Sequence, residues 1–259
     1  MIEVATFVPL FFAAIAIGFF ASLLGIGGGV FMTPLLLLGG FVATQPEAAG
    51  TSIAAVVFTG LSASIAYYRR RVIDVRIGLL FMPSAIAGVF VGRFIVQRVD
   101  PKWLTIAFAI FLLYPAGMML FGRTAKDVRG HGETRTSGPV FYLLVVVLGL
   151  AAGTATKLFG IGGGTVFVPS LVLFLGLDIR TAVAVSLFVM IPTAAISAAT
   201  AWIEGALHLE YAIPLILGIT LGAQIGPRIG SRIPKKRLRQ LFGLVVLYAA
   251  VNMFLKGIG

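Results

Sequence analysis

Long apolar runs separated by short charged stretches dominate the chain. No charged residue lies between Val4 and Pro46, and comparable runs recur up to the C-terminus. A hydrocarbon core about 30 Å thick needs roughly 20 apolar residues per helix, and most of these runs reach that length. The pattern predicts ten helical segments, at residues 5–24, 30–43, 48–68, 75–97, 102–121, 139–159, 165–177, 181–203, 209–228 and 238–256.

The segments form two related halves. The motif Gly-Ile-Gly-Gly-Gly at residues 25–29 recurs at residues 160–164, and a proline follows each copy at the same distance, an offset of 135 residues. An offset of 134 then continues without a gap and pairs Ala48 with Ala182, Ser52 with Ser186, Gly88 with Gly222, Arg98 with Arg232 and Tyr114 with Tyr248. We expect membrane repeats at 1–121 and 139–259, joined by a basic cytoplasmic linker at 122–138 and together forming one transport domain.

The loop charges predict that the two halves have opposite orientations. The loop after the third segment carries four arginines in the first half but only Glu204, His208 and Glu210 in the second, and the next loop is the more basic one in the second half. Because Lys and Arg favour the cytoplasmic side, equivalent loops should lie on opposite sides, with both termini outside. The predicted fold is an all-α integral membrane protein of two inverted repeats, an arrangement typical of secondary transporters.

Composition supports the membrane assignment and removes other classes. Hydrophobic residues make up 59% of the chain, charged residues 11%, and the mean hydropathy is +1.06. A soluble domain carries about 25% charged residues. The net charge of +11 resides in short loops without an aromatic-basic platform, so we expect the lipid bilayer and no nucleic acid as partner. The absence of cysteine excludes disulfides, thiolate metal sites and cysteine nucleophiles.

The glycine motifs predict a helix break at membrane depth in each half. Such backbone is tolerated only where it is buried in protein or lines a watery cavity. The break exposes the amides and the positive dipole end of the following helix, which form an anion site without a charged side chain. The alternative is that the glycines permit close helix packing. The candidate binding residues are Gly25, Gly27, Gly28, Gly29, Gly160, Gly162, Gly163 and Gly164.

Lys157 is the charged residue set within a long apolar stretch, three residues before the second glycine motif. Intramembrane cations are costly and usually functional. Since no acidic residue lies near it in sequence, we expect an anionic substrate to be its partner. The alternative is that its side chain snorkels to an interface.

Small hydroxyl residues near the glycine motifs form a further set of candidates. Thr51 and Ser52 begin the third segment of the first half, Ser186 matches Ser52 in the second half, and Thr165 follows the second motif. Their hydroxyl groups can donate hydrogen bonds to the oxygens of an anion. They can equally serve helix packing or bond to their own helix.

Acidic residues and histidines are absent from the middles of the predicted segments. All nine Asp and Glu residues and both histidines lie at segment ends or in loops. The chain also lacks an H-E-x-x-H metal motif and an ATP-hydrolysing motif. We therefore expect no enzyme activity, no metal and no cofactor. Coupling to protons and homo-oligomer formation are left open.

The motif residues resemble a known family. Gly18–Pro34, followed by Ala49–Ser52, is similar to the sulfite exporter TauE/SafE family, and the second copy matches at Gly160–Pro169 and Ala184–Ser186. Val185 stands where the family pattern has a threonine. The resemblance implies a permease of the cytoplasmic membrane that exports sulfite, sulfoacetate or a related organosulfur anion. The alternatives are transport of a carboxylate, another inorganic oxyanion or a neutral solute, an anion channel, and an intramembrane enzyme.

Overall fold

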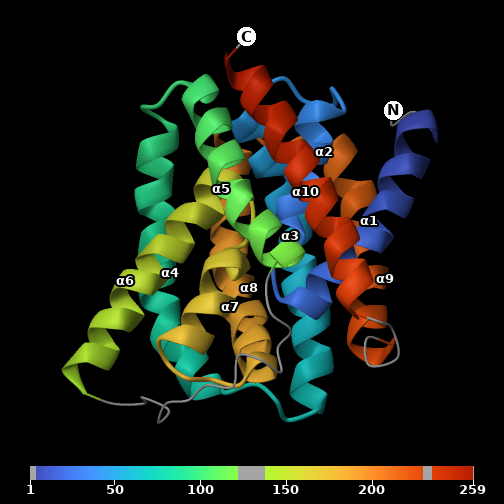
Figure 1. Ribbon diagram of the computed structural model, residues 1–259. Coiled ribbons are helices and arrows are strands. Elements are labelled where there is room, and N and C mark those ends of the chain that lie inside the picture. Colours follow the sequence, from blue (N-terminus) through green and yellow to red (C-terminus); the bar gives the residue numbers. More distant parts are fainter. Residues whose placement is uncertain (1–3, 122–137, 230–234, 259) are drawn as a thin grey trace.

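The chain folds into a bundle of helices (Figure 1). The computed structural model describes residues 4–121, 138–229 and 235–258, which contain ten α-helices and no strand. The first half forms α1 (Val4–Leu24), α2 (Gly29–Leu38), α3 (Gln45–Arg69), α4 (Val75–Val96) and α5 (Pro101–Phe121). The second half forms α6 (Pro139–Phe159), α7 (Gly164–Leu173), α8 (Ile179–Ile203), α9 (Leu209–Ile229) and α10 (Lys235–Ile258). Apart from Gly138, the predicted linker lies outside the described residues.

Helix ends follow local sequence signals. Apart from α2 and α7, each helix begins and ends within three residues of its predicted segment. The carboxylates of Asp74 and Asp178 accept hydrogen bonds from the amides of Ile77 and Arg180, at 3.1 and 3.0 Å, and so cap α4 and α8. α3 starts before its apolar run because a proline and an acidic residue occupy its first turn, where both favour a helix start.

The outer surface of the bundle is apolar. Six helices, α1, α3, α4, α5, α6 and α8, are long and apolar enough to cross a membrane. The apolar parts of α9 and α10 among the described residues are shorter. Trp103, Phe121 and Leu143 are 67%, 86% and 62% exposed, an amount of apolar surface that water would penalise and lipid accommodates. The protein is an all-helical, multi-pass membrane protein, as the sequence predicts.

The two helices that follow the glycine motifs are too short to span a bilayer. α2 and α7 contain ten residues each, about 15 Å of helix and half the thickness of the hydrocarbon core. The sequence predicts longer segments here, to residues 43 and 177. Both helices end earlier because glycine-containing turns follow them, with positive φ at Gly40 and Gly176.

Repeat-related helices make equivalent packing contacts in the two halves. α1 packs against α9 as α6 packs against α4, while α3 packs against α8 and α5 against α10. Small residues allow these backbones to approach closely. A Cβ on Gly88 would overlap the carbonyl oxygen of Leu150, and one on Gly222 would overlap that of Ile15, which are equivalent contacts in the two halves.

One pair of repeat-related helices, α5 and α10, runs in opposite directions. Figure 1 shows α5 and α10 side by side with antiparallel courses, and α1 begins at the same end of the bundle at which α10 ends. α3 and α8, the most buried of the candidate spans, lie in the middle. The interior therefore consists of α3 and α8 with the two short helices against them.

Candidate functional site

Both glycine motifs break the helix as predicted. α1 ends at Leu24 and α2 begins at Gly29, while α6 ends at Phe159 and α7 begins at Gly164. In the first loop Gly25, Gly27 and Gly28 have φ of 71°, 76° and 90°, and in the second Gly160, Gly162 and Gly163 have 67°, 73° and 76°. These are left-handed conformations that only glycine adopts without strain. The motifs are therefore backbone turns, buried within the protein.

The two loops lie against each other. A Cβ on Gly29 would overlap the carbonyl oxygen of Gly160, and a Cβ on Gly164 would overlap that of Gly25. Met190 lies against both loops, because its Sδ is the nearest atom to a Cβ placed on Gly27 or on Gly162. The alternative reading of the motifs, close packing, thus holds together with the helix break.

Serine hydroxyls join each loop to the opposite half. Ser52 Oγ of α3 lies 3.3 Å from the carbonyl oxygen of Gly160, and Ser186 Oγ of α8 donates to that of Gly25 at 3.2 Å. Ser52 Oγ also lies 3.1 Å from its own helix at Ala49 O and 2.8 Å from Thr33 Oγ1. In this conformation the two serine hydroxyls hold the loops, and their predicted bonds to a substrate anion stay a prediction.

The two threonine candidates lie in different surroundings. Thr51 Oγ1 accepts a hydrogen bond from the backbone amide of His208 at 3.1 Å, which ties α3 to the loop before α9. Thr165, in the first turn of α7, is 4% exposed, and its hydroxyl has no hydrogen-bond partner among the described residues. No side chain caps α7 or α2, because glycine occupies the N-cap of both. These N-terminal turns keep their amides for backbone or ligand oxygens.

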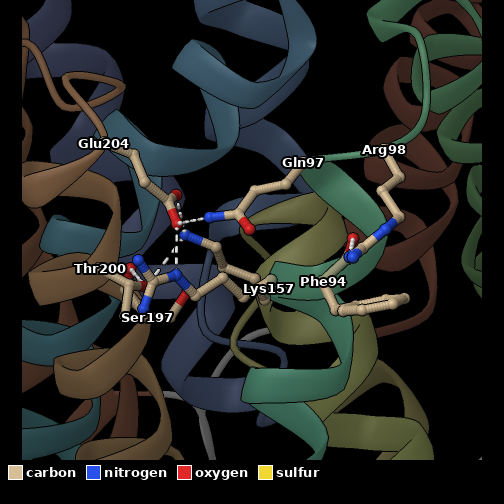
Figure 2. A network of polar contacts seen from close by, with 8 residues as sticks. Phe94, Gln97, Arg98, Lys157, Ser197, Thr200 and Glu204 are labelled. Carbon is tan, nitrogen blue, oxygen red and sulfur yellow. Dashed lines mark hydrogen bonds and ion pairs between the residues drawn. The ribbon is translucent and has the colours of Figure 1, made fainter.

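Lys157 is the centre of a polar network (Figure 2). Its Nζ donates to Thr200 Oγ1 at 3.0 Å and to Glu204 Oε2 at 2.6 Å. The other oxygen of Glu204 accepts from Arg93 Nε at 2.7 Å and from Gln97 Nε2 at 3.3 Å. The Lys157 side chain is 4% exposed, so it does not snorkel to the surface, and the side chains of Glu204 and Arg93 are 17% and 34% exposed.

The expectation that Lys157 has no protein partner is wrong. Glu204 is 47 residues away in sequence, but α6 and α8 pack together and bring the two side chains into contact. The acidic residue still lies at a helix end as predicted, because it is the C-cap of α8. Arg93, Gln97, Thr200 and Glu204 were missed. The repeat alignment holds a signal for Glu204, because this residue matches Arg70 while its partner Lys157 matches Ser22, so the charges at both positions differ between the halves.

A small cavity adjoins this network rather than the glycine loops. Its volume is about 10 Å³, room for about one water molecule. It is lined by Pro46, Gly50, Val96, Lys157, Ser197, Ala201, Glu204 and Ala206. Among the described residues, no group of three His, Asp or Glu side chains lies close enough to hold a metal ion. The network therefore combines two cationic side chains with one carboxylate at the edge of a cavity of this size.

Comparison with known proteins agrees with this architecture. The family profile described as sulfite exporter TauE/SafE matches residues 10–253. A Bacillus subtilis protein named probable membrane transporter protein YunE is 27% identical over 98% of this chain and 99% of its own length. A probable membrane transporter protein of Haemophilus influenzae is 29% identical over 92% of this chain and 94% of its own. No solved structure matches the chain.

Proposed function

Because the chain belongs to the sulfite exporter TauE/SafE family, we propose that it is a secondary transporter that exports small anions across the cytoplasmic membrane. Sulfite, sulfoacetate and related organosulfonates are the first candidates. The observation that carries the proposal is the burial of Lys157, in the last turn of the helix before the second glycine loop, with Arg93 bound to the same carboxylate. Buried cations of this kind in a membrane protein usually mark the path of a substrate.

The proposed mechanism is alternating access between inverted halves. Residues 1–121 and 139–259 act as one transport domain, and the antiparallel courses of α5 and α10 support their inversion. The bonds from Ser52 and Ser186 hold the two loops against each other, which supports the interpretation of this conformation as closed to an anion at the loops. For an anion to pass, these loops must separate, which presents the amides at the N-termini of α2 and α7 to the anion.

The orientation follows from the basic ends of the helices. We place Arg69, Arg70 and Arg71 at the cytoplasmic surface and both termini outside. Because the chain contains no cysteine, single thiols test this placement directly. Arg70→Cys should react with a membrane-impermeant maleimide only after the cells are opened, whereas Glu210→Cys should react in intact cells. Labelling of both positions from the same side would contradict the inverted arrangement.

Purified protein in liposomes should move sulfite in a saturable manner. We expect the flux to level off with concentration and to be competed by sulfoacetate, because a carrier turns over one bound substrate at a time. The measurement is uptake of labelled sulfite, with protein-free liposomes as the control. A current that rises in proportion to the driving force would instead identify a channel, and competition by carboxylates alone would move the proposal to that class of anion.

A further inference from the structure

Glu204 is held the way a bound anion would be. Its two carboxylate oxygens accept from an ammonium, a guanidinium and an amide nitrogen, supplied by Lys157, Arg93 and Gln97 on two other helices. Such a set of donors converging on a pair of oxygens suits any small oxyanion. Figure 2 shows the side chains of Gln97 and Lys157 pointing toward the carboxylate of Glu204.

The cluster carries more positive than negative charge. Arg93 and Lys157 contribute two positive charges and Glu204 one negative charge, which leaves +1. The other described acidic side chains near this end of α3 and α9, Glu47 and Glu210, instead lie 3.7 and 3.4 Å from His208 nitrogens. Lys157 uses two of its three donors in the described contacts, and it lines the small cavity.

The fold does not need this ion pair. The repeat-related positions in the other half carry Ser22 in place of Lys157, Ala66 in place of Thr200 and Arg70 in place of Glu204. The same helix contact forms there without a lysine and a carboxylate, because α1 packs on α3 as α6 packs on α8. Because the two halves share their helix packing but only one carries this charged cluster, the cluster points to a role in binding rather than in packing.

The two partners differ in their exposure. Thr200, which itself donates to the Ser197 carbonyl, bonds Lys157 from α8, and Lys157 is almost fully buried. Glu204 instead is the C-cap of α8, at the end of the helix. The side chain of Glu204 is 17% exposed and that of Lys157 4%, so a displaced carboxylate has a way to the surface while the ammonium stays buried. A sulfite ion is larger than the present cavity, so it fits only where the carboxylate has left.

We propose that Lys157, Arg93 and Gln97 form an oxyanion-binding site, and that Glu204 occupies this site as an internal anion until a substrate displaces it. This inference rests on the proposed transport of small anions and specifies the site for it. It makes the carboxylate a competitor of the substrate, so removing its charge should improve binding.

Glu204→Gln tests the proposal by direct binding of sulfite to the detergent-purified full chain. We expect the Kd to fall about tenfold, because the anion no longer displaces a charged competitor. The Tm should also rise more on adding sulfite than it does for the wild type, since binding stabilises the folded state. Glu210→Gln, which removes the same charge from a neighbouring residue without contact to Lys157, is the matched control and should bind sulfite as the wild type does.

Two outcomes would overturn the inference. One is sulfite binding by Glu204→Gln that is equal to or weaker than that of the wild type, and the other is equal tightening in Glu210→Gln. If Glu204→Gln does not fold, Glu204→Asp decides, because it keeps the charge but shortens the reach and should tighten binding by a smaller factor. Flux through the wild-type protein in liposomes distinguishes this inference from the proposed function. If the wild type transports anions but Glu204→Gln does not bind sulfite more tightly, only the role of Glu204 as a competing anion is rejected. If the wild type transports no anion, the transport function itself is rejected.

Discussion

Gly29→Ala and Gly164→Ala are expected to abolish transport and to destabilise the folded protein severely. In each case the new methyl group would overlap a backbone carbonyl oxygen of the opposite loop, Gly160 or Gly25. The backbone of a closed turn cannot move aside as a side chain does. The free energy of unfolding should therefore fall by at least the upper end of the range for overpacked cores, about 3 kcal/mol. That corresponds to a Tm lower by roughly 6–12 °C, measurable by fluorescence-detected size exclusion after heating.

Gly117→Ala is the matched control for these variants. It makes the same change within α5, at a position without positive φ and with no atom within 4 Å of the added Cβ. It should leave flux unchanged and stability equal or higher by about 0.5–1 kcal/mol, because alanine favours a helix interior over glycine. Normal transport by Gly29→Ala or Gly164→Ala would contradict the closed contact of the two loops.

The helices could be predicted from the sequence because the bilayer imposes a simple rule. Uncharged runs near 20 residues must be helical, and charged residues mark their ends, so α6 begins and ends at the predicted residues. The shorter α2 and α7 show the limit of that rule. Their apolar runs continue past the last helical turn, and hydropathy does not distinguish a buried turn from a helix.

The glycine loops could be placed, but not resolved residue by residue. Four glycines in five positions predict a break, and the structure has one in each half. The sequence does not tell which glycine is required for its φ and which for close approach. The structure separates these roles, since Gly28 has a positive φ and meets the side-chain end of Ile219, whereas Gly29 is helical and meets a backbone oxygen.

The polar network at Lys157 was only half accessible to sequence reasoning. A lysine in an apolar run is visible at once, but its partner comes from a different helix and depends on how α6 and α8 pack. Proximity along the chain is the wrong guide in a bundle, where contacts join residues more than a hundred positions apart, as Arg93 and Glu204 do. A comparison of charges between the two repeats is the better guide, because the fold repeats and the function need not.

Lys157→Met should lower anion flux by about 10–100-fold, the second large effect that we expect. Methionine keeps most of the side-chain volume but cannot donate to an anion, and a hydrogen bond to a charged group contributes about 1.5–3 kcal/mol. The measurement is labelled sulfite uptake into liposomes at matched amounts of folded protein. Destabilisation is expected as well, because removing one member of a buried pair leaves Glu204 partly uncompensated, although Arg93 still pairs with it.

The double variant Lys157→Met with Glu204→Gln separates binding from folding. The second substitution removes the carboxylate that Lys157→Met leaves partly uncompensated, and Arg93, which loses its partner, is 34% exposed, so the double variant should recover much of the Tm that the single variant loses. Its flux should stay low, because the donor that holds the anion is still missing. If flux returned together with stability, Lys157 would serve only to neutralise Glu204, and the anion path would have to lie elsewhere, at the amides of the glycine loops.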